Sequence, residues 1–199
     1  MIDAKKIGQR IAEAIANEAG PCFYPGKFKP PHKGHYAAAT ELSRRDYIKQ
    51  VNVIISRKTI DGITPEDSLM IWNMYLQAEP NPKLSVKIST DESPIVTIIN
   101  YLKANPTVDP VYIATGDDEI DDIQYGKALQ EDFGDRIKTI PVHEKAGIIS
   151  APVVRNILAS GDFEAFKEAV PEAAYNKGAA PKIFKMLATK VKGNGPEQA

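Results

Sequence analysis

The sequence lacks the features that mark secreted, membrane-spanning and strongly basic proteins. Its single cysteine, Cys22, cannot form an internal disulfide, which suits a reducing compartment. No apolar stretch is long enough to cross a bilayer, and residues 1–20 space isoleucines among charges as a helix does, unlike a signal peptide. The formal net charge is -1, so no overall field attracts nucleic acid or anionic lipid. We expect a cytoplasmic protein with no membrane or nucleic-acid partner.

The sequence does contain the composition of an ordinary globular protein, because 43% of its 199 residues are hydrophobic and 26% are charged. Strand patterns alternate with helical patterns along the chain, which predicts an α/β fold: a Rossmann-like, doubly wound parallel sheet of about five strands with helices on both faces. The expected strands are 22–24, 51–56, 84–89, 111–115 and 136–142, and the expected helices are 34–45, 65–77, 94–104, 152–160, 162–170 and 181–192.

Extra helices flank this pattern at both ends, so we divide the chain into three parts. Residues 1–20 form an N-terminal helix, 21–171 form the main domain, and 172–199 form a C-terminal helix with a disordered tail. Capping residues support the central helices, since Thr64 precedes Pro65 and is followed by Asp67 in a capping-box pattern.

The densest group of unusual residues is "FYPGKFKPPHKGH" at 23–35, directly after the first expected strand. Ligands of doubly wound sheets lie beyond the carboxyl ends of the strands, so this segment stands where binding is expected. Gly26 permits close approach of the backbone to a ligand, and Gly34 at a helix start is expected to leave N–H groups open to an anion. His32 and His35 should lie on one side of that helix. These residues predict a phosphate cradle with imidazole donors.

A second phosphate site is predicted at "ISAPVVR", residues 149–155. Ser150 stands at a helix start, where free N–H groups and the helix dipole favour an anion, and Arg155 adds a guanidinium in the first turns. Either motif alone is better explained as an ordinary structural turn or capped helix, and it is their combination that favours a site.

Weaker candidates follow two other strands. Arg57 and Lys58 follow the second strand, and Asp117 and Asp118 follow the fourth, so all four are candidate substrate-binding residues on the same rim. The aspartates suit a ribose hydroxyl or a substrate amine, and a solvated turn or helix start is the equal alternative for both pairs. Trp72 shares a helix face with leucines, which favours the core over a base-stacking platform.

These motifs resemble those of a known family. "GKFKPPHKGH" resembles the G-x-F-x-P-x-H-x-G-H signature of the HxGH nucleotidyltransferase superfamily, and "ISAPVVR" resembles its I-S-S-T-x-x-R motif. The resemblance spans 23–171, with both motifs in the family order. Ala151 and Pro152 replace a serine and a threonine of the second motif, so a hydroxyl contact to the phosphates is missing or comes from elsewhere.

The resemblance implies transfer of a nucleotidyl group from a nucleoside triphosphate to a phosphorylated small molecule, with release of pyrophosphate and with Mg²⁺ bridging the triphosphate. The acceptor phosphate is already ionised, so alignment and charge neutralisation suffice. The implied catalytic residues are His32, His35, Lys29 and Arg155. The implied nucleotide-binding residues are Gly26, Lys27, Phe28, Gly34, Ser150 and Arg155.

The first motif resembles most the G-R-F-Q-P-F-H-x-G-H form of nicotinamide-nucleotide adenylyltransferases, with Lys27 in place of arginine. This favours adenylyl transfer from ATP to an acceptor such as nicotinamide mononucleotide. The alternative is cytidylyl transfer from CTP to a phosphorylated alcohol. The lysine-rich motif also resembles uncharacterised phage-encoded members.

Two readings come from other classes. A zinc hydrolase would use His32, His35 and His143, all the histidines of the chain. A nucleic-acid-binding module is suggested by the H-x-G-H loop of class I aminoacyl-tRNA synthetases, although the short, neutral chain argues against it. The acceptor and any homo-oligomer stay open.

Overall fold

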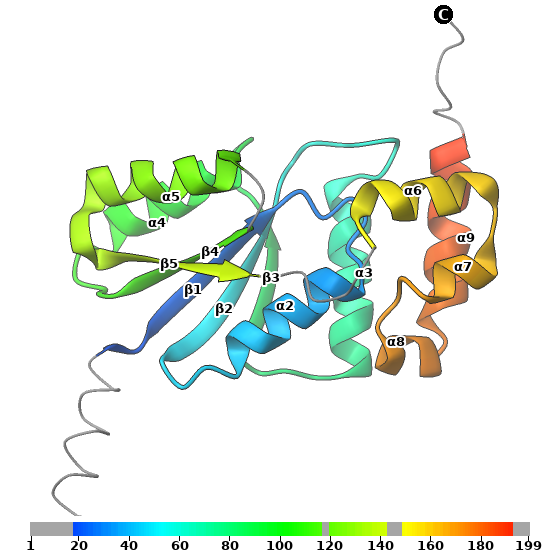
Figure 1. Ribbon diagram of the computed structural model, residues 1–199, viewed down its shortest axis with the longest axis horizontal. Helices are drawn as coiled ribbons and strands as arrows, with labels where there is room; N and C mark the ends of the chain where they lie inside the picture. Colours follow the sequence, from blue (N-terminus) through cyan, green and yellow to red (C-terminus); the bar gives the residue numbers. More distant parts are fainter. Residues whose placement is uncertain (1–17, 117–119, 143–148, 193–199) are drawn as a thin grey trace, which may run out of the picture.

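The computed structural model describes residues 18–116, 120–142 and 149–192. Its centre is a parallel sheet with strand order β3-β2-β1-β4-β5 (Figure 1). The strands are β1 (Gly20–Gly26), β2 (Ile48–Ile55), β3 (Leu84–Ile88), β4 (Val111–Gly116) and β5 (Ile137–Val142). This arrangement confirms the expected doubly wound α/β sheet, because strand order runs outward in both directions from β1.

Helices cover both faces of the sheet, as the alternation of strands and helices predicted (Figure 1). They are α2 (Lys33–Ser43), α3 (Pro65–Ala78), α4 (Pro94–Ala104), α5 (Ile120–Phe133), α6 (Ala151–Ser160), α7 (Phe163–Lys167), α8 (Glu172–Asn176) and α9 (Ala179–Lys192). Helices α4 and α5 lie over one face, α2 and α3 over the other, and α6–α9 form a further group beyond α3. The sequence patterns missed α5 and α8, and the helix expected at 162–170 is only five residues long.

The buried side chains of the strands alternate between these two faces. In β1, Cys22 and Tyr24 pack in the larger cluster on the α2 and α3 side, whereas Phe23 packs in the smaller cluster with residues of α4. The larger cluster extends without a break into the C-terminal helices, where Ala174 and Leu187 are fully buried. The packing of the sheet therefore continues into α6–α9, which brings the second motif towards the loop after β1.

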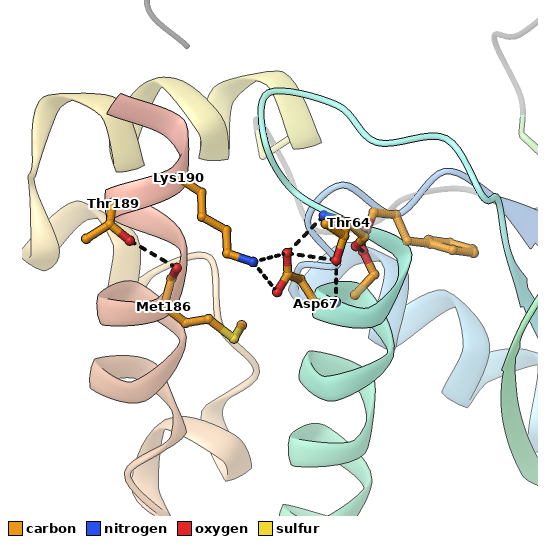
Figure 2. Close-up of polar contacts among 7 residues, drawn as sticks. Thr64, Asp67, Met186, Thr189 and Lys190 are labelled. Atoms are coloured by element: carbon orange, nitrogen blue, oxygen red, sulfur yellow. Dashed lines mark hydrogen bonds and ion pairs between the residues drawn. The ribbon is translucent and has the colours of Figure 1, made fainter. Parts of the chain in front are cut away.

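The N-terminus of α3 is also the attachment point for the last helix. Thr64 and Asp67 form the predicted capping box, in which each side chain accepts the other's backbone N–H. Both oxygens of the Asp67 carboxylate also accept from Lys190 Nζ of α9 at 2.7 Å (Figure 2). Burial alone would raise the pKa of Asp67, but the hydrogen bonds from Lys190 and Thr64 outweigh it and bring that pKa below 3.8.

Two expectations concern the ends of the chain. The predicted N-terminal helix lies almost wholly within 1–17, and the predicted disordered tail within 193–199, so both fall outside the described residues. The division at residue 172 stays an interpretation. Within the described ranges, none of the helices is both long enough and apolar enough to span a bilayer.

Candidate active site

The two motifs meet at the carboxyl edge of the sheet, where β1 lies between β2 and β4. In a doubly wound sheet this reversal of strand order opens a crevice at the strand ends, which is the usual ligand position. The loop after β1 leaves this edge of the sheet and leads into α2. Arg155 of α6 reaches the same loop, because its Nη1 donates to the Lys29 carbonyl at 2.8 Å.

His32 and His35 are brought together as the sequence predicted, with ring centroids 3.8 Å apart. His32 is the N-cap of α2: its Nδ1 accepts from the backbone N–H of Gly34 at 3.1 Å. In return, the His35 Nδ1 accepts from the backbone N–H of His32 at 3.2 Å. The pair is therefore an imidazole version of a capping box, which the periodicity of the sequence could not reveal.

This cap changes the interpretation of Gly34. We expected its helix start to offer open N–H groups to an anion, but the Gly34 N–H is bonded to His32, and the Lys33 N–H donates to the Ala169 carbonyl at 2.8 Å. The expectation of open N–H groups there was wrong, because side chains and a neighbouring carbonyl already use them. This helix start holds the two imidazole rings, which are buried: His32 is 1% exposed and His35 is 9% exposed.

The cap sets the tautomer of both rings, and burial sets their protonation state. Since each Nδ1 accepts a hydrogen bond, the proton of each neutral ring is assigned to Nε2. Burial, with a smaller effect of Lys33, lowers the pKa of His32 from 6.5 to about 4. Burial and the neighbouring His32 hold the pKa of His35 well below 6.5. At neutral pH both rings are therefore neutral Nε2–H donors.

A pH dependence of stability follows. In the unfolded chain His32 binds a proton near pH 6.5, whereas in the folded chain it stays neutral down to about pH 4. The free energy of unfolding should therefore be highest above pH 6.5 and fall by about 3 kcal/mol for His32 as the pH drops to 4. Urea unfolding at a series of pH values measures this. In the matched variant His32→Asn, which keeps a cap acceptor without titrating, the fall should be smaller, and an equal fall would contradict the assignment.

The ring of Phe28 packs between Gly26 and His35. Phe28 has a φ of 51°, unusual for a bulky residue, and this turns its ring back into the core, where it packs edge-on against His35 at 5.0 Å. A Cβ on Gly26 would lie 2.6 Å from that ring, so glycine is required there by packing. The Phe28 side chain is 3% exposed and packs against His35 from the core side, so its role in nucleotide binding stays a prediction.

Lys29 was expected to offer a catalytic cation, but its side chain points inward and is 1% exposed. Its Nζ donates to the carbonyls of Lys27 at 2.9 Å and Ser56 at 3.2 Å, which ties the loop to the end of β2. Burial lowers the pKa of this amine from 10.5 to about 8, with nearby carboxylates opposing the effect. The geometry thus gives Lys29 a role in holding the loop, while the exposed Lys27 keeps its cation on the surface.

The second motif begins a helix, α6, as predicted. Ser150 is the N-cap residue of α6 but makes no side-chain cap bond, so its exposed hydroxyl is not used by the helix. Arg155 donates through Nε to Asp61 Oδ2 at 2.5 Å, in addition to its bond to the first loop. Sequence reasoning missed Asp61, although its place in an Asp-Gly pair between two isoleucines is a turn signal.

Of the remaining candidate residues, some are described by the structure and others lie outside the described ranges. Arg57 and Lys58 are exposed directly after β2, on the expected rim. Asp117, Asp118 and His143 lie outside the described residues, although β4, which precedes the aspartates, does neighbour β1 as expected. Within the described ranges, no three His, Cys, Asp or Glu side chains could together hold a metal ion. Trp72 is fully buried, which confirms its assignment to the core.

Comparisons with known proteins support the fold. No protein-family model matches the sequence, and no curated protein does. Among solved structures, the chain resembles Plasmodium falciparum nicotinic acid mononucleotide adenylyltransferase in complex with APC, with a TM-score of 0.62 and 14% identity, covering 84% of this chain and 98% of that one. The same enzyme in complex with NaAD gives a TM-score of 0.61 and 16% identity over the same shares. This likeness confirms the α/β fold over most of the chain.

Proposed function

We propose that the chain is a nucleotidyltransferase that transfers an adenylyl group from ATP to a phosphorylated small molecule, such as nicotinamide mononucleotide, and releases pyrophosphate. The observation that carries this proposal is the histidine pair: two neutral imidazoles, with their Nε2–H tautomers set by the start of α2, lie at the edge where the sheet reverses its strand order. The likeness of fold to an adenylyltransferase supports the same chemistry.

In the proposed reaction an oxygen of the acceptor phosphate attacks the α-phosphorus of ATP, and the bond between that phosphorus and the bridging oxygen breaks as pyrophosphate leaves. The Nε2–H groups of His32 and His35 donate to oxygens of the α-phosphate as negative charge builds there. They do so without changing protonation state, because both rings are neutral at physiological pH. No proton has to be removed from the attacking phosphate.

The cations of the site suit the departing pyrophosphate. Arg155 keeps unused N–H donors in its guanidinium plane, and Lys27, Arg57 and Lys58 are exposed around the same edge. Mg²⁺ bound with the triphosphate would neutralise phosphate charge. We propose that phosphate oxygens and water would hold most of that ion.

Nucleotide binding is the direct test. We expect millimolar ATP with Mg²⁺ to raise the melting temperature by several degrees, since a ligand at 100 times its Kd stabilises the folded state by about 2.7 kcal/mol. AMP at the same concentration, which lacks the β- and γ-phosphates, should have a much smaller effect. A pyrophosphate-release screen then pairs ATP or CTP with a panel of phosphorylated acceptors.

Three results are informative. Release with ATP and a mononucleotide acceptor supports the proposal as stated. Release with CTP alone would replace it with cytidylyl transfer. No melting shift and no release with either nucleotide would contradict nucleotidyl transfer.

A further inference from the structure

Arg155 is held from two sides before any ligand is present. Its Nε donates to Asp61 Oδ2 at 2.5 Å, and its Nη1 donates to the Lys29 carbonyl at 2.8 Å. A guanidinium has five N–H groups in one plane, so three remain for a ligand. The Arg155 side chain is 17% exposed and that of Asp61 is 46% exposed, which places the pair at the rim and not in the core.

The segment that carries Asp61 is a rigid turn. Asp61 and Gly62 have φ values of 49° and 76°, and Ile60 and Ile63 exchange backbone hydrogen bonds of 3.2 and 2.9 Å. Positive φ at both central positions is the geometry of a type I′ turn, for which Asp-Gly is a favoured pair. Ile63 is fully buried, and Thr64 directly after it caps α3. The backbone of Asp61 is therefore fixed by its neighbours on both sides.

Building on the nucleotidyl transfer proposed above, we infer that Asp61 is a positioning residue that orients Arg155 towards the triphosphate. A long, flexible arginine loses rotamer freedom when it binds a ligand, and two fixed acceptors remove much of that freedom in advance. The Asp61 carboxylate supplies one acceptor from the β2–α3 connection, and the Lys29 carbonyl supplies the other from the loop after β1. The three free N–H groups of Arg155 then stay in a plane set by both segments.

If Asp61 acted only through its negative charge, its removal would have the opposite effect on activity, and this difference makes the inference testable. A carboxylate beside an anion site repels phosphate, so its removal should strengthen triphosphate binding if Asp61 acted only through its charge. If Asp61 positions Arg155, its removal should weaken catalysis in spite of that charge. Glu66 provides a matched control, because it is an exposed carboxylate in the first turn of α3 that makes no hydrogen bond or ion pair with Arg155 among the described residues.

The test measures kcat and KM for the triphosphate in Asp61→Gly, Asp61→Asn, Glu66→Gln and Arg155→Ala proteins and in the Asp61→Gly/Arg155→Ala double variant. Glycine keeps the positive φ without strain and removes the acceptor, whereas asparagine also tolerates this φ and keeps an acceptor oxygen. We expect Asp61→Gly to lower kcat/KM about tenfold, asparagine to restore much of it, and Glu66→Gln to change nothing. In the Arg155→Ala background, Asp61→Gly should cause no further loss.

The inference is overturned if Asp61→Gly leaves kcat/KM unchanged or raises it, or if the same loss recurs in the Arg155→Ala background. Should the glycine variant fail to fold in urea titrations, the same cycle with Asp61→Asn decides, with a smaller loss expected only when Arg155 is present. A wild-type protein that neither binds nor turns over a nucleoside triphosphate is a different result. That result refutes the proposed function and, with it, the proposed role of Asp61.

Discussion

Replacement of His35 by asparagine should slow nucleotidyl transfer by roughly 10²–10³, the loss measured when one donor to a developing oxyanion is removed. Asparagine can place its Oδ1 where the His35 Nδ1 accepts the His32 N–H, so the cap of α2 can survive. It has no group in the position of Nε2–H. The Kd of ATP should change much less than kcat, because the lost contact strengthens mainly in the transition state.

The controls separate chemistry from folding. His35→Ala also removes the Nδ1 acceptor and the ring that packs on Phe28, so it should lose stability as well as activity. His35→Asn should instead retain most of the wild-type free energy of unfolding. If His35→Asn transferred nucleotide at the wild-type rate, donation to the α-phosphate by this ring would be refuted. Release of a tightly bound zinc ion by either substitution would point to the hydrolase alternative.

Replacement of Arg155 by alanine is expected to lower kcat/KM for the triphosphate about 10- to 150-fold, which corresponds to 1.5–3 kcal/mol for charge-assisted hydrogen bonds. Both KM and kcat should suffer, since the guanidinium would contact the phosphates in the ground state and the departing pyrophosphate in the transition state. Stability should change little, because Asp61 is 46% exposed and can be hydrated once its partner is gone.

Two further variants show whether charge or shape matters at this position. Arg155→Lys keeps the cation but cannot bond Asp61, the Lys29 carbonyl and a phosphate in one plane, so it should recover only part of the activity. Arg44→Ala removes an exposed cation at the opposite end of α2 and should leave the kinetics unchanged. Wild-type kinetics in Arg155→Ala would refute a role of the second motif in triphosphate binding and leave it only a structural role at the start of α6.

The sequence by itself determined the fold class and the position of both motifs. Strand and helix periods depend on neighbours a few residues apart, and so do caps such as that of Thr64 and Asp67, so these were predicted correctly. The closeness of His32 and His35 followed from a spacing of three on one helix. Helix α5 was missed because its charged sequence gives a weak apolar period.

Only the tertiary structure decided where the side chains of the loop point. Lys29 turns inward because the carbonyl of Ser56, far along the chain, lies within reach of its amine. Phe28 turns into the core because Gly26 and Trp72 make room and contacts for its ring. Arg155 meets Asp61 only because the packing of α6 beyond α3 brings two distant segments to one edge of the sheet. Such directions depend on contacts between residues remote in sequence, and no local spacing encodes them.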